Sequence, residues 1–279
     1  MIIAVTGSSG LLGRSIVEAL TAAGHSVRGI DTVPASVAGS AHIIADLRDG
    51  GEAVLALKGA EAVVHAAAIP RPTGRTASAV FTTNIEATFA VVEAAVTLGI
   101  RRLVYASSFS VLGFPFFEKP VDLRYLPVDE AHPTGPQDAY ALSKALGEEI
   151  VAAAVRRGAL DAVSLRMPWI QLPGTFFKEV GPRRASPESG RDLWSYIDAR
   201  DAAAAFLAAV EAKTVGHIPL FLSAADTYSE TPTAELIAAA FGKLKLHRRF
   251  TAHEAVIDTQ AARRLIGFVP RYSWRDYRP

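Results

Sequence analysis

Tyr140 and Lys144 stand four residues apart in the segment Tyr140-Ala141-Leu142-Ser143-Lys144, which lies within a helical pattern. Residues at this spacing share one face of a helix, so the phenol and the ammonium lie close together. A phenol is a poor base at its ordinary pKa of about 10, but a neighbouring positive charge favours the phenolate. The pair could therefore exchange a proton with a hydroxyl or carbonyl group. The alternative is a surface pair, which helices also carry by chance.

Two serines close an apolar strand earlier in the chain. Ser107 and Ser108 follow Leu103-Val104-Tyr105, and open parallel sheets bind their ligands at the carboxyl ends of the strands. Serine is otherwise a common turn residue. The position of Ser108 therefore makes it a candidate for ligand binding. Its residue type fits a ligand contact and a turn equally well, so both interpretations stay open.

Three glycines lie between the first apolar strand and the first helix, in Gly7-Ser8-Ser9-Gly10-Leu11-Leu12-Gly13. Glycine permits a tight turn and lets backbone N–H groups approach a pyrophosphate. The last glycine lets the helix pack close to the strand. The spacing is GxxGxxG rather than the GxGxxG of the standard dinucleotide fingerprint, and such glycines can also be purely structural.

Asp31 strengthens the case for a dinucleotide. It ends the second predicted strand, 18 residues after Gly13, where a carboxylate can accept hydrogen bonds from an adenosine ribose. Its charge would repel a 2′-phosphate, and Thr32-Val33-Pro34 supplies no basic replacement. The predicted cofactor is therefore NAD rather than NADP, with a plain surface carboxylate as the alternative.

Strands alternate with helices through the first part of the chain. Apolar runs predict strands at 2–6, 26–30, 42–45, 62–66, 103–107 and 162–166, and periodicity predicts helices at 11–23, 51–57, 79–98 and 139–156. This alternation predicts an α/β fold, a Rossmann-like doubly wound parallel sheet with helices on both faces. From residue 168 to about 190, proline and glycine predict a loop-rich stretch. Helices at 198–210, 232–241 and 259–266 and a strand at 218–222 are predicted beyond it.

The length predicts two units, since 279 residues correspond to roughly two domains of about 150. Residues 1–167 are predicted to form an NAD-binding Rossmann domain. Residues 168–279 are predicted to form a smaller, mixed substrate-binding part, of which 198–222 packs back on the Rossmann sheet.

Composition excludes several classes of function. The absence of cysteine removes disulfides, thiol nucleophiles and cysteine-based zinc sites. No second histidine stands at a metal-ligand spacing from His65, so no metal is predicted. A net charge of +1 gives no reason to expect nucleic acid, and no uninterrupted apolar run approaches the roughly 18–20 residues of a membrane span. The start Met1-Ile2-Ile3 has no basic flank, so no signal peptide and a cytoplasmic location are predicted.

Together these motifs resemble the extended short-chain dehydrogenases/reductases, in their NAD-dependent epimerase/dehydratase branch. The resemblance covers nearly the whole chain. It rests on the order and spacing of Gly7-x-x-Gly10-x-x-Gly13, Asp31, Asp46-Leu47, His65-Ala66-Ala67-Ala68, Asn84, Ser107-Ser108, Tyr140-x-x-x-Lys144 and Tyr196-Ile197-Asp198-Ala199-Arg200-Asp201.

The resemblance implies a role for each of these residues. Tyr140 would be the acid/base, and Lys144 would bind the nicotinamide ribose and lower the pKa of Tyr140. Ser108 would hydrogen-bond the reacting oxygen. Asn84 is expected to orient a helix or relay a proton, and His65 to be structural. NAD would be held by Gly7, Gly10, Leu11, Leu12, Gly13, Asp31, Asp46, Leu47, Ala66, Ala67, Tyr140 and Lys144.

Departures from the family pattern bear on the reaction. Dehydratases of this branch have Thr-Asp-Glu where this chain has Ser108-Phe109-Ser110, and Phe109 cannot supply the additional acid or base that elimination of water needs. Epimerases commonly carry an Asn that contacts the sugar nucleotide where this chain has Trp169. An indole cannot replace the paired donor and acceptor of an amide.

The predicted activity is hydride transfer between NAD and a secondary alcohol or carbonyl of a small sugar, sugar acid or polyol. The alternatives are a sugar or nucleotide-sugar epimerase with transient oxidation by bound NAD, and a non-catalytic NAD-binding regulator. Ser108, Phe109, Trp169 and Arg183 are the candidate substrate contacts. The loop 114–117 is expected to form an apolar lid or to pack against the second part. A homodimer through a helical pair is expected from the resemblance.

Overall fold

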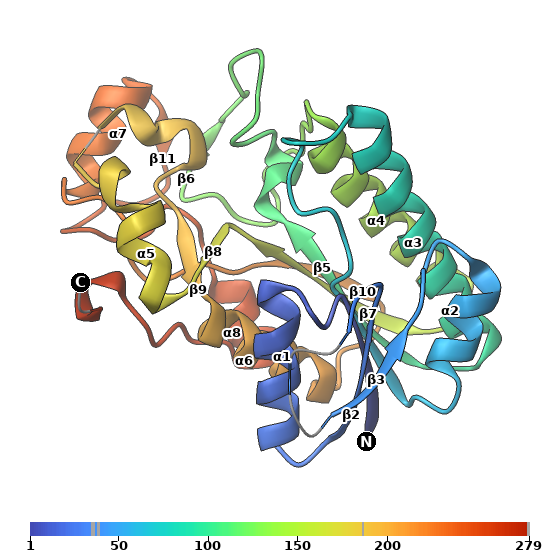
Figure 1. Cartoon of the computed structure of the whole chain (residues 1–279). Coiled ribbons are helices and arrows are strands. Elements are labelled where there is room, and N and C mark those ends of the chain that lie inside the picture. Colours follow the sequence, from blue (N-terminus) through green and yellow to red (C-terminus); the bar gives the residue numbers. More distant parts are fainter. Residues whose placement is uncertain (35–36, 38–39, 186, 278–279) are drawn as a thin grey trace.

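A single parallel sheet organises the molecule (Figure 1), and the computed structural model describes residues 1–34, 37, 40–185 and 187–277. Its seven strands lie in the order β10-β7-β5-β4-β1-β2-β3. The chain moves outward from β1 on one side and then on the other, so the direction of winding reverses between β1 and β4. The strands are β1 (Ile2–Thr6), β2 (Ser26–Asp31), β3 (Ala41–Ile44), β4 (Ala62–His65), β5 (Arg102–Ser108), β7 (Asp161–Met167) and β10 (His217–Phe221). This confirms the predicted doubly wound parallel sheet.

Helices cover both faces of the sheet (Figure 1). On one face lie α1 (Leu11–Ala22) and α6 (Ala199–Glu211), and on the other α2 (Gly50–Leu57), α3 (Ala77–Thr97) and α4 (Ala139–Arg156). Alternate residues of β1 serve the two layers, because Ile3 and Val5 belong to one buried cluster and Ala4 to the other. A strand buried on both faces needs an unbroken apolar run, which is the pattern that predicted it.

Polar caps set where these helices begin. Asp49, Thr76 and Asp198 each accept a hydrogen bond from a backbone N–H in the first turn of α2, α3 and α6. Asp138 accepts two at the start of α4, from Tyr140 N and Ala141 N. Such caps satisfy N–H groups that have no partner inside the helix. The start of α4 fixes the rotation of the helix and therefore the direction of Tyr140 and Lys144.

The stretch from 168 to 190 contains regular elements, so the prediction of a loop-rich region was wrong there. It holds β8 (Trp169–Gln171), which pairs in parallel with β9 (Tyr196–Asp198), and the helix α5 (Pro173–Glu179). Pro173 stands at the start of α5, where the missing N–H costs nothing and the fixed φ suits the helix. A proline that punctuates the sequence pattern here begins a helix.

The remaining elements form a smaller layer beyond the carboxyl ends of the strands (Figure 1). They include β6 (Tyr125–Leu126) paired with β11 (Lys245–Leu246) and α7 (Thr233–Phe241), whereas α8 (Gln260–Ile266) packs against α6 and β10 of the main sheet layers. Aromatic side chains dominate their core, with Phe176, Trp194, Tyr196, Tyr228 and Trp274 among its buried members. Both α6 and β10 come from residues 198–222 and lie in the main sheet layers. The boundary near residue 167 stays a prediction.

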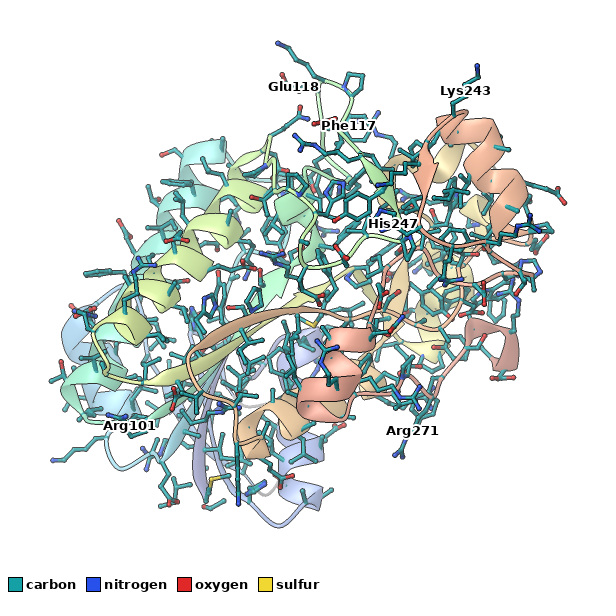
Figure 2. All side chains as sticks on the ribbon, turned by 180° about the vertical axis from the view of Figure 1, so that it is seen from behind. Arg101, Phe117, Glu118, Lys243, His247 and Arg271 are labelled. Atoms are coloured by element: carbon teal, nitrogen blue, oxygen red, sulfur yellow. The ribbon has the colours of Figure 1, made fainter. Side chains whose placement is uncertain are left out.

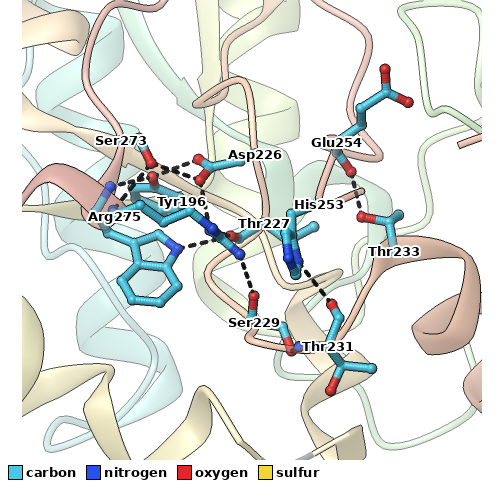
Figure 3. Close-up of polar contacts among 11 residues, drawn as sticks. Tyr196, Asp226, Thr227, Ser229, Thr231, Thr233, His253, Glu254, Ser273 and Arg275 are labelled. Atoms are coloured by element: carbon cyan, nitrogen blue, oxygen red, sulfur yellow. Dashed lines mark hydrogen bonds and ion pairs between the residues drawn. The ribbon is translucent and has the colours of Figure 1, made fainter. Parts of the chain in front are cut away.

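The C-terminal segment is fastened to this layer by polar contacts (Figure 3). Ser273 Oγ and Arg275 Nη1 each donate to Asp226 Oδ2 at 2.7 Å. Trp274 N donates to the hydroxyl of Tyr196 at 2.8 Å, and its indole N–H donates to Thr227 O at 2.9 Å. The segment thus covers the aromatic core from outside.

Among the helices of the described residues, one, α3, is long and apolar enough to cross a membrane by length and composition alone. Of the 18-residue window concerned, 44% is buried inside the protein. Val80, Ala87, Val91 and Ala95 form part of that buried face. The apolar residues of α3 are thus largely used in packing against the sheet and its neighbours α2 and α4.

Candidate active site

The turn between β1 and α1 is built on glycines that have no room for a side chain. Gly7 has a φ of +69°, and a Cβ there would lie 2.7 Å from Ala67 Cα. A Cβ on Gly13 would lie 2.0 Å from Gly7 O. No side chain caps α1, and its first turn carries no acidic residue. The start of α1 therefore has neither a side-chain cap nor a negative charge in its first turn, a combination that suits a diphosphate.

Asp31 lies at the end of β2 and closes this turn from the side. Its Oδ2 accepts a hydrogen bond from Ser9 N at 2.9 Å, and its Oδ1 accepts one from Thr32 N at 2.8 Å. The carboxylate is therefore fixed in direction beside the glycine loop. This is the arrangement expected of a group that recognises an adenosine ribose.

Asp31→Ala is expected to weaken NAD binding roughly tenfold or more and to relax discrimination against NADP, since hydrogen bonds to a charged group contribute about 1.5–3 kcal/mol. Fluorescence titration with NADH and with NADPH measures both effects. Asp31→Asn is the matched control, because it removes the repulsive charge while keeping an acceptor. Equal affinity of the unmutated protein for NADH and NADPH would contradict the role given to Asp31.

The other residues predicted to hold the cofactor have mixed surroundings. The N–H groups of Ala66 and Ala67 donate to Thr6 Oγ1 at 3.1 and 3.2 Å, which brings them against Gly7.

Leu47 is buried in the sheet's helix-covered core. The Asp46 carboxylate pairs with Arg48 Nε at 3.0 Å, which lowers the pKa of Asp46. Leu11 is partly exposed and Leu12 packs against the core. Their part in cofactor binding stays a prediction.

His65 forms a buried chain of hydrogen bonds. Its Nδ1 lies 2.7 Å from Thr6 Oγ1, and its Nε2 lies 3.1 Å from Thr88 Oγ1. Since the Thr6 oxygen already accepts two N–H groups, its hydroxyl donates to Nδ1, and Nε2 carries the proton. Burial, followed by the charge of Lys144, lowers the pKa of His65 to about 3. The imidazole is thus neutral and braces β1, β4 and α3.

The structure brings Ser108, Tyr140 and Lys144 together at the carboxyl end of β5. Lys144 Nζ donates to Ala106 O at 2.7 Å and lies 5.8 Å from the centre of the Tyr140 ring. The side chain of Ser108 is close enough to Tyr140 to act on its phenol, whose pKa it lowers. Ser108 Oγ also accepts from Ser110 N at 3.1 Å, because the 3-10 helix η1 (Phe109–Leu112) starts there. A phenol, an ammonium and a serine hydroxyl thus lie together at the carboxyl end of β5.

The pKa of Tyr140 in this structure is higher than the sequence led us to expect. Burial raises the pKa of Tyr140 to about 12, against the opposing hydrogen bond from Ser108. Burial also lowers the pKa of Lys144 to about 8, with Glu148 opposing. Lys144 therefore does not bring the pKa of the phenol below its ordinary value here, because the cost of burying a phenolate is larger.

Asn84 links the two helices behind the site. Its Oδ1 accepts from Ile69 N at 2.7 Å, and its Nδ2 donates to Ser143 Oγ at 3.0 Å. Ser143 in turn donates to Tyr140 O at 2.8 Å. Asn84 thus sets the position of α4 relative to α3, and it makes these contacts from a buried position.

The residues predicted to contact substrate lie in two different environments. Trp169 is partly buried, and the guanidinium of Arg183 stacks 5.1 Å from its ring centre. Arg183 is also 3.7 Å from Asp192. Phe109 is buried and stacked on Phe114, with 6.4 Å between ring centres. Trp169 and Arg183 thus form one unit, whereas the Phe109 ring belongs to the aromatic core.

The loop after η1 packs against the second part. Phe114 is buried in the aromatic core. Figure 2 shows Phe117 and Glu118 on the projecting part of this loop. The guanidinium of Arg191 lies 4.2 Å from the ring centre of Phe117 and donates to Phe117 O at 2.8 Å. Of the two expectations for residues 114–117, packing describes Phe114, while Phe117 is covered from outside by an arginine.

Sequence reasoning missed one buried ion pair of the site. Glu148 follows Lys144 by one helical turn, and Arg166 lies near the end of β7, where Arg166 Nη2 and Glu148 Oε2 are 2.7 Å apart. The signal was available, because a charged residue one helical turn after Lys144 and another inside an apolar strand both need partners when buried.

A parallel sheet with a glycine turn after β1, and a serine, tyrosine and lysine gathered at its carboxyl edge, defines a short-chain dehydrogenase/reductase. The model of the NAD dependent epimerase/dehydratase family matches residues 3–219. The chain therefore belongs to the NAD-dependent epimerase/dehydratase family. The cofactor of this family is NAD, and the glycine turn and Asp31 fit it, since they leave an unobstructed cradle beside a fixed carboxylate.

Relatives share much of the chain. The protein is 32% identical to L-arabinose 1-dehydrogenase (NAD(P)(+)) of Haloferax volcanii over 69% of this chain and 76% of that enzyme. It is 29% identical to uronate dehydrogenase of Pseudomonas putida over 58% of this chain and 59% of that enzyme. A short-chain dehydrogenase/reductase superfamily protein from Agrobacterium tumefaciens, solved with bound NAD, matches with a TM-score of 0.75 and 27% identity. That match covers 99% of this chain and 94% of the other.

In the part of the chain that the structure describes, no group of three or more His, Cys, Asp or Glu side chains could hold a metal ion.

Proposed function

We propose that this protein is an NAD-dependent dehydrogenase that oxidises a secondary hydroxyl group, or reduces the matching carbonyl, of a small sugar, sugar acid or polyol. The observation that carries the proposal is the gathering of Ser108, Tyr140 and Lys144 beside a glycine turn fitted for NAD. The relatives named for L-arabinose and uronate support a carbohydrate substrate.

Tyr140 is the residue that moves the proton. In the oxidative direction its phenolate takes the hydroxyl proton of the substrate, and in the reductive direction its phenol returns it. Ser108 holds the substrate oxygen through its hydroxyl, beside the phenol of Tyr140. When bound, NAD supplies the hydride acceptor and a positive nicotinamide ring. Lys144 contributes a positive charge and hydrogen-bond donors on the side of Tyr140 that faces Ala106.

Dehydratase activity is disfavoured by the residue that follows Ser108. Eliminating water requires an acid and a base beyond Tyr140. Phe109 can supply neither, and its ring is buried against Phe114. The neighbouring Ser110 is neutral at ordinary pH. The site therefore holds the machinery for hydride transfer without that for elimination.

A panel of aldoses, uronates and polyols, each mixed with the protein and NAD, tests the proposal. Net formation of NADH, followed by its absorbance, is the expected result. Changed sugar stereochemistry without accumulated NADH would point instead to an epimerase. Tight NADH binding with neither outcome would point to a regulator. The panel is repeated with Tyr140→Phe, so that NADH formed by a contaminating enzyme is recognised.

Two further expectations are part of the proposal. The protein is expected to act in the cytoplasm, without nucleic acid or membrane partners. It is also expected to form a homodimer through α3 and α4, on which Phe89, Leu142 and Leu146 remain exposed at 54%, 41% and 40%. Exposed apolar side chains on a helix pair suit such an interface.

A further inference from the structure

A buried ion pair fastens α4 to the sheet directly behind the site. Tyr140, Lys144 and Glu148 follow one another at four-residue spacing, so all three lie along one side of α4. Glu148 Oε1 accepts from Ser107 Oγ at 2.5 Å and from Arg166 Nε at 2.9 Å. Its Oε2 accepts from Arg166 Nη2 at 2.7 Å. The side chains of Arg166 and Glu148 are only 7% and 10% exposed.

This arrangement joins three elements of the site. Ser107 precedes Ser108 on β5, Glu148 follows Lys144 on α4, and Arg166 lies on β7 with its guanidinium 5.2 Å from the ring centre of Phe221 on β10. Glu148 thus binds the strand that carries the serine to the helix that carries the tyrosine and the lysine. Both ions are held with fixed geometry, because the carboxylate meets the guanidinium through two parallel hydrogen bonds.

Glu148 is also a negative charge beside a buried ammonium. The Lys144 ammonium lies 5.0 Å from the Tyr105 ring centre and donates to the carbonyl of Ala106. These groups are uncharged, as is the buried His65. The titratable groups that face Lys144 are His65 on β4, Tyr105 on β5, and Tyr140 and Glu148 on α4. Three more act on these neighbours: Asp138 on Tyr140, and Arg166 on β7 and His217 on β10 on Glu148. Of these, Glu148 raises the pKa of Lys144 against the effect of burial.

We propose that Glu148 is a positioning residue for the reaction, which acts through Lys144 by keeping its ammonium charged and through Ser107 by holding β5 against α4. The proposal rests on the proposed function, in which Lys144 works as a cation beside Tyr140. Arg166 orients Glu148 and balances its charge. An apolar pair could also fasten the helix to the strand, so the negative charge beside Lys144 is the part that packing alone does not require.

Glu148→Gln removes the charge and keeps the shape and an acceptor oxygen. The test is the titration of ε-¹³C-labelled lysine by NMR in the cofactor-free protein, with the Lys144 signal assigned by its loss in Lys144→Arg. The pKa of Lys144 is expected to fall by about one unit, the effect of losing a nearby opposite charge. In the same variant, turnover is expected to fall at a lower pH, by the same amount, because Lys144 loses its proton there. Glu148→Asp, which keeps the charge, is expected to restore most of both.

Glu149→Gln is the matched control, since Glu149 is the next residue on α4 but is exposed and pairs with the exposed Arg156. It should leave the titration and turnover unchanged. An unchanged Lys144 titration in Glu148→Gln, with only a lower melting temperature, would overturn the proposal. If Glu148→Gln fails to fold, Glu148→Gln combined with Arg166→Met removes both charges, and Lys144 must still titrate lower. Because the titration needs neither substrate nor cofactor, its outcome is independent of the panel that tests the proposed function.

Discussion

Tyr140→Phe is expected to reduce turnover on an established substrate by roughly 10²–10⁴-fold, the usual contribution of a positioned acid or base. The variant keeps the ring, which packs beside Lys144, and loses only the hydroxyl that Ser108 contacts. NADH affinity is expected to stay nearly unchanged, because the glycine turn and Asp31 provide separate contacts. Steady-state kinetics and NADH fluorescence measure the two quantities on the same sample.

The pH dependence gives this prediction a direction. Since the pKa of Tyr140 is raised to about 12, the protonated phenol dominates at neutral pH. Oxidation of an alcohol uses the phenolate, so its rate should rise toward alkaline pH, whereas reduction of the carbonyl uses the phenol and should not need that rise. The residual rate of Tyr140→Phe should lack the alkaline increase.

The control for this variant is a second tyrosine whose hydroxyl also makes a buried contact. Tyr277 donates to Asp198 at the C-terminal segment and is remote from Lys144 in the sequence and in its contacts. Tyr277→Phe should lower stability without changing the pH profile. Wild-type turnover in Tyr140→Phe would show that the proposed acid/base assignment is wrong.

The main sheet and its helices could be predicted because their signals are local. The run from Ile2 to Thr6 is apolar without interruption, since both faces of β1 are covered. The bounds of α4 agree with the prediction because Asp138 caps its start. By contrast, β8 was missed because a three-residue strand next to Pro168 and Pro173 has no periodicity to detect.

The structure brings together the serine, tyrosine and lysine that the sequence singled out, whereas the pKa of Tyr140 differs from the expectation. Lys144 was expected to lower the pKa of Tyr140, but burial raises that pKa, and burial is a property of the folded chain. The Glu148–Arg166 pair joins residues that are 18 positions apart, on a helix and a strand. Only the crossover from α4 to β7 brings them together.

Gly13→Ala is expected to damage the cofactor site much more than Gly10→Ala. The added Cβ would lie 2.0 Å from Gly7 O and 2.8 Å from Ser8 Cα. Both are backbone atoms of the turn, which therefore has to move away from α1. Overpacking of this kind costs about 1–3 kcal/mol, which corresponds to a loss of affinity of about 5-fold to 150-fold where it separates the N–H groups that meet a diphosphate. We expect NADH affinity to fall by that factor and the melting temperature to fall with it.

Gly10→Ala is the control that separates this collision from a general need for glycine. Gly10 has a φ of −73°, which any residue adopts, and a Cβ there would meet only Gly7 O at 3.3 Å. A shift of a few tenths of an ångström would accommodate it, so Gly10→Ala should keep most of the NADH affinity. Both variants are measured by NADH titration and thermal unfolding. If Gly13→Ala bound NADH as tightly as Gly10→Ala, close approach of α1 to the turn would not be what shapes the cradle. The different consequences of one methyl group at Gly10 and at Gly13 follow from the path of the backbone, since the two glycines are equivalent in the sequence motif.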